Sequence, residues 1–198
     1  MKRWNCRVIL AGLIATVWLC ACVRVQGQTA EAPEREAARV SLGTTSGSAG
    51  DLIVVPIYFT PAQGVEVAHL KLEISYVSAN LKFSNLEAGV AATTGGVDLH
   101  SEVKEAKNEK GIDTQTLQIT ASFASSEPAK KGIPEGLLAY VAMKISESGR
   151  SARITLRGSA QARELGSNKA LYLRDFETTL DVFGAGAQPM LTCFFFSH

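Results

Sequence analysis

Apolar and polar residues alternate along several short stretches of the chain. Residues 69–76, 116–123 and 153–157 show this pattern. Residues 52–59 read as a strand that is apolar on both faces, with Ile53, Val55, Ile57 and Phe59 on one face and Leu52, Val54, Pro56 and Tyr58 on the other. A period of two with one apolar face is typical of strands in antiparallel sheets. Segments rich in turn-forming residues separate these runs, so we expect an all-β, antiparallel β-sandwich with jelly-roll topology and about nine strands.

Two segments depart from simple alternation. Pro56 lies inside the run at 52–59, although proline has no N–H to donate to a neighbouring strand. Because Pro56 falls between Val55 and Ile57 and so on the opposite face, we expect it to point away from the main core, at an edge or bulge. Residues 135–146 are apolar on both faces. This predicts a central strand that is covered on both sides, with a turn of helix as the alternative.

The first 27 residues differ from the rest in charge and composition. Lys2, Arg3 and Arg7 precede an apolar run from Val8 to Cys20, and small residues and a polar stretch follow. This order predicts a secretory signal peptide over residues 1–27, with cleavage after Gly27. The apolar run is too short and wrongly flanked for a stable membrane span. We therefore expect the protein to be secreted or held in the cell envelope.

The end of this leader contains a second signal. Leu19–Cys22 reads LCAC, which resembles the lipobox of bacterial lipoproteins, where the cysteine is lipidated and becomes the new N-terminus. Cys22 would be that residue, and its lipid would be the only predicted contact with a membrane. The alternative is an ordinary signal peptide in which Cys20 and Cys22 are merely small apolar residues. Either route exports the protein.

The remaining chain divides into a linker, one domain and a tail. Residues 28–38 are polar and rich in alanine and glutamate, which predicts a linker, and the strand pattern fills residues 39–184. Residues 185–198 form a tail whose apolar part is too short to span a bilayer. We interpret the tail as truncated or artefactual, with a docking strand as the alternative. Between Val23 and Thr192 there is no cysteine, so the domain has no disulfide framework.

Charge and motifs argue against several functions. Without the four basic residues of the leader, the chain carries 16 basic and 19 acidic residues. It has no basic stripe, so we expect no nucleic-acid partner. His69, His100 and His198 share no ligand spacing, and we predict neither a metal nor a cofactor. No serine lies in a G-x-S-x-G motif, and the acids of residues 102–109 interleave with lysines. The chain is therefore not expected to be an enzyme.

The order of the strand and turn signals resembles that of the bacterial cohesin domain. That family has a turn ending in Gly-Asp and then a strand containing Val-Pro-Val, and here Gly50-Asp51 precedes Val55-Pro56-Ile57. The next family strand ends in Tyr-Asp-Pro and is followed by an apolar pair and a glycine. The corresponding residues here are Tyr76, Leu81, Phe83 and Gly89, with Val77 and Ser78 in place of Asp-Pro. The resemblance covers Arg39 to Gly184 and implies the sandwich fold.

Cohesins bind dockerin modules, which are small calcium-containing helical domains, and are not enzymes themselves. The resemblance therefore implies a non-catalytic binding module with a dockerin-type or other protein partner. Cohesins bind through one face of the sandwich, where polar residues surround an apolar patch. By analogy, the candidate partner-binding residues are outward-facing positions on two strands, together with an apolar anchor from the strand at 136–145: His69, Lys71, Glu73, Gln118, Thr120, Leu138 and Tyr140.

Carbohydrate binding is the alternative function, because related carbohydrate-binding modules share the sandwich architecture. Such modules usually stack sugars on planar aromatic side chains. The only tryptophans, Trp4 and Trp18, lie in the leader, which counts against this alternative. The tyrosines that remain available for a polysaccharide are Tyr58, Tyr76, Tyr140 and Tyr172.

Overall fold

The computed structural model describes residues 37–123, 131–148 and 150–184. The predicted signal peptide, the lipidation site Cys22, most of the linker and the tail at 185–198 lie outside the described residues. Within the described residues, no helix is long and apolar enough to cross a membrane.

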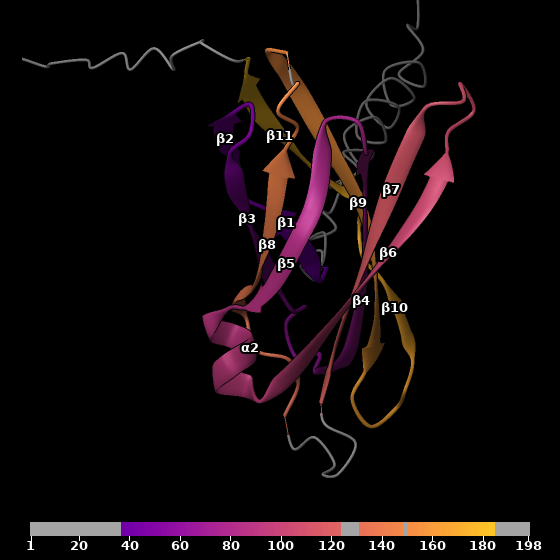
Figure 1. Cartoon of the computed structure of the whole chain (residues 1–198). Helices are drawn as coiled ribbons and strands as arrows, with labels where there is room; N and C mark the ends of the chain where they lie inside the picture. Colours follow the sequence, from indigo (N-terminus) through magenta and orange to yellow (C-terminus); the bar gives the residue numbers. More distant parts are fainter. Residues whose placement is uncertain (1–36, 124–130, 149, 185–198) are drawn as a thin grey trace, which may run out of the picture. The chain divides into compact units, whose positions relative to one another are not determined.

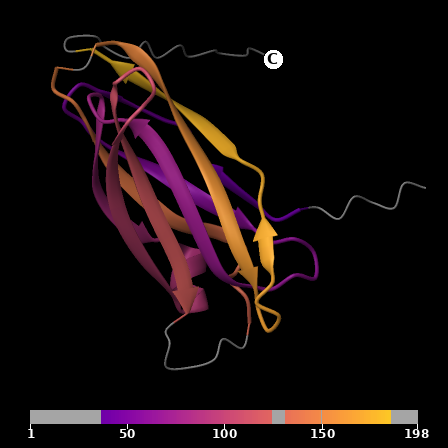
Figure 2. The same ribbon diagram turned by 90° about the vertical axis from the view of Figure 1, so that its right-hand side faces the viewer.

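The described chain forms two sheets that face each other (Figure 1). Sheet A has the strand order β1 (Arg39–Leu42), β3 (Leu52–Thr60), β8 (Gly136–Ile145) and β5 (Leu81–Ala88). Sheet B has the order β2 (Thr45–Ser48), β11 (Phe176–Phe183), β9 (Ala152–Glu164), β4 (Val67–Val77), β7 (Asp113–Phe123) and β6 (Val97–Lys107), with β10 (Ala170–Tyr172) also paired to β9. Figure 2 shows sheet B from its outer side, with β4 at the middle of the sheet.

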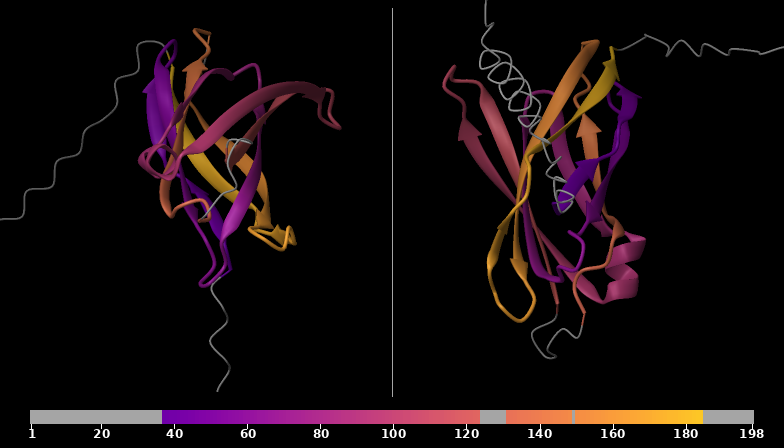
Figure 3. Two further views of the ribbon diagram at one scale, coloured as in Figure 1. Left: turned by 90° about the horizontal axis from the view of Figure 1, so that it is seen from below. Right: turned by 180° about the vertical axis from the view of Figure 1, so that it is seen from behind.

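The predicted all-β sandwich is confirmed, with two differences in detail. The described residues form eleven strands, and not about nine. The two additional strands are β2, which forms after the chain crosses from sheet A to sheet B, and the short β10, which precedes β11. The pairing of β2 with β11 is parallel, whereas the other strand pairs are antiparallel. A short helix, α2 (Val90–Gly95), joins β5 to β6 and contacts β8. It lies at the same end of the sandwich as the β9–β10 hairpin (Figure 3).

The core lies between the sheets and is built by the alternation seen in the sequence. Ile53, Val55, Ile57 and Phe59 of β3 are buried, as are Leu70, Leu72 and Ile74 of β4 and Leu117, Ile119 and Ala121 of β7. Each of these strands shows polar or exposed residues at the intervening positions. Burial of these apolar side chains is the main source of stability expected for a domain of this kind.

Pro56 occupies the outer side of β3, where β1 ends. Its carbonyl oxygen accepts a 2.8 Å hydrogen bond from the Gly43 N–H, so the Pro56 peptide groups point toward β1 and not toward β8. The missing N–H therefore removes no hydrogen bond to β8. A register shift between β3 and β8 follows directly, between Ile57 and Tyr58. The expectation that Pro56 points away from the core next to a bulge is confirmed.

The strand at 136–145 differs from its prediction in one respect. As β8 it is central in sheet A, between β3 and β5, which was expected. Its inner residues Val141, Met143 and Ile145 are buried, but Tyr140 and Ala142 on the outer side remain partly exposed and Lys144 is exposed. No described element covers that side, so the prediction of a strand covered on both faces is wrong.

Candidate functional site

The outer side of sheet B presents a broad polar surface. The strand register aligns its side chains in rows, because residues paired across antiparallel strands point to the same side. One row runs from Tyr172 through Gln161, Lys71 and Thr120 to His100. We call this surface the sheet B face and define it by its outward residues on five strands: His69, Lys71, Glu73, Ser75, His100, Glu102, Lys104, Thr116, Gln118, Thr120, Ser122, Arg157, Ser159, Gln161, Arg163 and Tyr172.

A hydrogen-bonded network holds the centre of the sheet B face. The Lys71 Nζ lies 2.9 Å from Oε1 of Glu73, and Gln118 Nε2 donates to the same oxygen at 2.6 Å. The hydrogen bond from Lys71, followed by that from Gln118, lowers the pKa of Glu73 below its ordinary value. Glu73 therefore stays ionised to a lower pH than an ordinary glutamate, and its hydrogen bonds hold the Lys71, Glu73 and Gln118 side chains together.

One end of the face is electropositive. His69 pairs in register with Arg163 on β9, and Lys71 lies on the same side of β4. Burial, and then the positive charges of Arg163 and Lys71, lower the pKa of His69. The Arg163 side chain donates to Asn168 Oδ1 at 3.4 Å and has no ion pair among the described residues. This corner is suited to receive a carboxylate from a partner.

Tyr172 is the one large apolar side chain that is exposed on the sheet B face as described. Its exposed fraction is 84%, and it lies beside Gln161 at the edge of the face. Exposed aromatic residues in such positions are typical anchors of protein interfaces, because the ring buries much area while its hydroxyl keeps a polar contact. The face thus combines one aromatic side chain with a polar surround.

The structure brings together five of the seven predicted partner-binding residues. His69, Lys71 and Glu73 lie on β4, and Gln118 and Thr120 lie next to them on β7. Gln118 pairs with Glu73, and Thr120 pairs with Lys71. Two adjacent strands therefore carry the predicted polar cluster on one surface.

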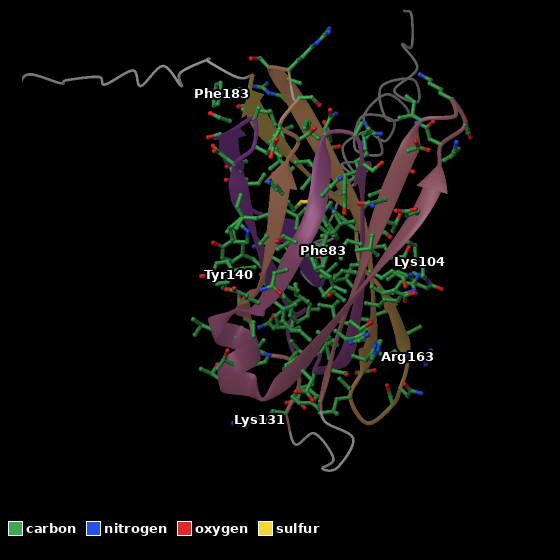
Figure 4. The ribbon with its side chains drawn as sticks, in the orientation of Figure 1. Phe83, Lys104, Lys131, Tyr140, Arg163 and Phe183 are labelled. Atoms are coloured by element: carbon green, nitrogen blue, oxygen red, sulfur yellow. The ribbon has the colours of Figure 1, made fainter. Side chains whose placement is uncertain are left out.

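Leu138 and Tyr140 do not belong to that surface, because both lie on β8 in sheet A. Leu138 is fully buried, so it is a core residue and is unable to anchor a partner. Tyr140 points outward on the opposite side of the sandwich from Lys104 and Arg163 (Figure 4). The prediction that these two residues supply the apolar anchor of the face is wrong, since alternation alone does not show which sheet a strand joins.

Sequence reasoning missed the contributions of β9 and β10. The alternation of Arg153, Thr155 and Arg157 with apolar residues was visible, but its continuation to Gln161 and Arg163 beside β4 was not. Tyr172 sits in a strand of only three residues, which is too short to produce a periodic signal.

No group of three or more His, Cys, Asp or Glu side chains that is able to hold a metal ion occurs among the described residues. Asp51 accepts from the Ser48 N–H, Asp113 pairs with Lys107, and Asp181 pairs with Arg153. These aspartates thus have separate local contacts and do not converge on one site.

The family model described as the cohesin domain matches residues 38–170, which is most of the described chain. The chain belongs to the cohesin domain family. Among curated proteins, a sequence comparison finds none that matches.

Several solved cohesins share the fold. The seventh ScaB type I cohesin of Pseudobacteroides cellulosolvens is 19% identical, with a TM-score of 0.54, and the match covers 80% of this chain and 99% of that one. The cohesin module of a family 33 glycoside hydrolase from Clostridium perfringens is 11% identical, with a TM-score of 0.55, over 75% and 98% of the two chains. The third ScaC cohesin of Acetivibrio cellulolyticus, solved in complex with the ScaB dockerin, is 18% identical with a TM-score of 0.50, over 74% and 99%.

Proposed function

We propose that this cohesin is a non-catalytic, extracytoplasmic binding module whose sheet B face recognises a dockerin-type protein. The observation that carries the proposal is the composition of that face. A fixed polar centre at Lys71, Glu73 and Gln118 on β4 and β7 lies beside an electropositive corner at Arg163 on β9 and an exposed aromatic at Tyr172 on β10. Polar groups that are already ordered lose little entropy on binding, and one aromatic anchor supplies apolar contact.

Membership of the family supports a protein as the partner. The Acetivibrio cellulolyticus cohesin with the same fold was solved bound to a dockerin. The replacement of Asp-Pro by Val77-Ser78 distinguishes this chain from the family pattern. We therefore propose a partner that is dockerin-type in its mode of recognition.

The proposed location follows from the leader. The charged start and apolar run of residues 1–27 support export, and Cys22 is the proposed anchor if the leader is processed as a lipoprotein. A module held at the envelope in this way would retain its partner at the cell surface or in the periplasm.

Capture on beads tests the proposal. The full chain is immobilised, and extracellular and envelope proteins of the source organism are passed over it in calcium and then in chelator. We expect a protein to be retained in calcium and released by the chelator, because removing the metal from a calcium-containing module removes the folding free energy that the metal supplies. Retention that does not respond to chelation would contradict a dockerin-type partner, and retention of polysaccharide alone would favour carbohydrate binding.

A matched pair of variants assigns the captured protein to a surface. Thr120→Arg places a long charged side chain in the middle of the sheet B face, next to Lys71. Thr60→Arg makes the same change at a partly exposed threonine of sheet A. The proposal expects capture to be lost with Thr120→Arg and kept with Thr60→Arg, and the reverse result would overturn the assignment to sheet B.

A further inference from the structure

The outer side of sheet A carries an apolar strip that the proposed function does not use. Along β3, Leu52, Val54 and Tyr58 have exposed fractions of 61%, 44% and 43%. They make up three of the six exposed large hydrophobic residues in the described chain, so the exposure is concentrated and not scattered. We define the apolar strip by these residues and their outward neighbours on β3 and β8: Leu52, Val54, Pro56, Tyr58, Tyr140 and Ala142. Contiguous exposed apolar surface of this kind marks an interaction site.

Charges of opposite sign flank the strip along β5. Lys82 lies directly opposite Lys144 of β8, an arrangement that is unfavourable for like charges. Lys144 is paired with Glu147 at 3.4 Å, whereas the Lys82 side chain has no ion pair or hydrogen bond among the described residues. Further along the same strand, Glu87 lies opposite Tyr140. One end of the strip is therefore basic, and the other end carries a carboxylate.

This arrangement is complementary to itself. If two copies stack their sheet A faces about a two-fold axis that runs across the strands, β3 lies on β3 and β5 lies on β5 in opposite directions. With the axis at the level of Val54, Leu52 faces Pro56 of the second copy, and Val54 faces its own counterpart. On β5 the same operation places Lys82 over Glu87 of the second copy, because Lys82 is level with Leu52 and Glu87 is level with Pro56. Every contact away from the axis occurs twice, as in any interface with two-fold symmetry.

We propose that the apolar strip is the docking surface for a second copy of this chain. The strip and its flanking charges span three strands spaced about 4.8 Å apart and six residue steps of about 3.4 Å, a face of roughly 10 Å by 20 Å between Cα atoms. Interfaces this small are weak and reversible. The dimer would leave both sheet B faces uncovered and pointing away from each other, so that two partners are held together.

Sedimentation velocity over a concentration series tests the proposal. The full chain is kept in reductant, so that cysteine bridges do not contribute, and a monomer–dimer equilibrium is expected. Val54→Asp should raise the dimer dissociation constant at least about tenfold, because each interface would bury two carboxylates against apolar groups. Ile112→Asp is the matched control, since Ile112 is exposed to the same 44% but lies in the β6–β7 turn. A monomer at all concentrations, or equal effects of the two variants, would overturn the proposal.

Exchange of charges tests the two-fold geometry itself. Lys82→Glu faces Glu87 of the second copy, and Glu87→Lys faces Lys82, so each single variant should weaken the dimer. The double variant Lys82→Glu/Glu87→Lys, and equally a mixture of the two single variants, restores opposite charges at both contacts. Recovery of the dimer in both cases is expected. If neither the double variant nor the mixture recovers the dimer, the proposed pairing is overturned, even if the apolar strip still associates non-specifically.

Discussion

At the scale of single residues, Glu73 shows how the sheet B face is kept in order. Its carboxylate receives hydrogen bonds from Lys71 on the same strand and from Gln118 on β7. Because the side chains of Lys71 and Glu73 remain 39% and 40% exposed, water screens their attraction, and we expect the pair to organise the surface more than to stabilise the fold.

The lowered pKa of Glu73 predicts how stability changes with pH. The ordinary pKa is 4.5, and the folded value lies below it. The contribution of Glu73 is therefore fully present above pH 4.5 and is lost as the pH falls through the folded pKa. Glu73→Gln should flatten the decrease in unfolding free energy below pH 4.5, as measured by denaturant titration at a series of pH values.

Glu102→Gln is the control for this measurement. Glu102 lies on the same face, but its contact with Lys104 is 3.9 Å and its side chain is 61% exposed. If the two variants change the pH dependence of the unfolding free energy equally, the Lys71–Glu73–Gln118 network has no special role in the loss of stability below pH 4.5.

At the scale of elements, Gly89 explains how β5 turns into α2. Its N–H donates to the Leu138 carbonyl oxygen at 2.8 Å, and its own carbonyl oxygen accepts from the Thr93 N–H at 3.0 Å. A Cβ at this position would collide with the Leu137 carbonyl oxygen. The requirement for glycine here is steric, because the backbone is extended with φ −79° and ψ 173°.

The close approach at Gly89 predicts a stability loss. Gly89→Ala must push β5 away from β8 and should lower the free energy of unfolding by about 1–3 kcal/mol. Ser84→Ala, at an exposed position of the same strand, should change it by no more than about 0.5 kcal/mol. Thermal unfolding of both variants measures the difference. If the Gly89→Ala protein is as stable as the parent, β5 and β8 are able to move apart at this position without loss of stability.

The elements also show how far the sequence alone reaches. The alternation of β4 and β7 was sufficient to predict these strands and their buried sides, because burial on one face imposes a period of two. The partners of β8 were not predictable, since a strand of either sheet has the same period. Helix α2 and strand β10 are too short for a periodic signal. The sequence thus predicted that the polar residues of β4 and β7 share one surface, whereas it gave no signal that Tyr172 lies beside them.

At the scale of the whole sandwich, the two outer surfaces differ in chemistry. The sheet B face is polar with one exposed aromatic, Tyr172, whereas the outer side of sheet A is apolar along β3. Partner recognition is the proposed function of the first surface, and association with a second copy is that of the second. The two proposed functions are separable, because the two surfaces have no residue in common.

The most direct measurement of the central claim is the affinity of the captured partner for Tyr172→Ala, determined by titration calorimetry of the full chain. We expect a loss of roughly tenfold or more, because the ring is the face's one large apolar contact. Val90→Ala removes a 66% exposed side chain at the start of α2 and should leave the affinity within about twofold. If Tyr172→Ala binds like the parent while Tyr140→Ala weakens binding, the partner docks on sheet A and the assignment of recognition to the sheet B face is contradicted.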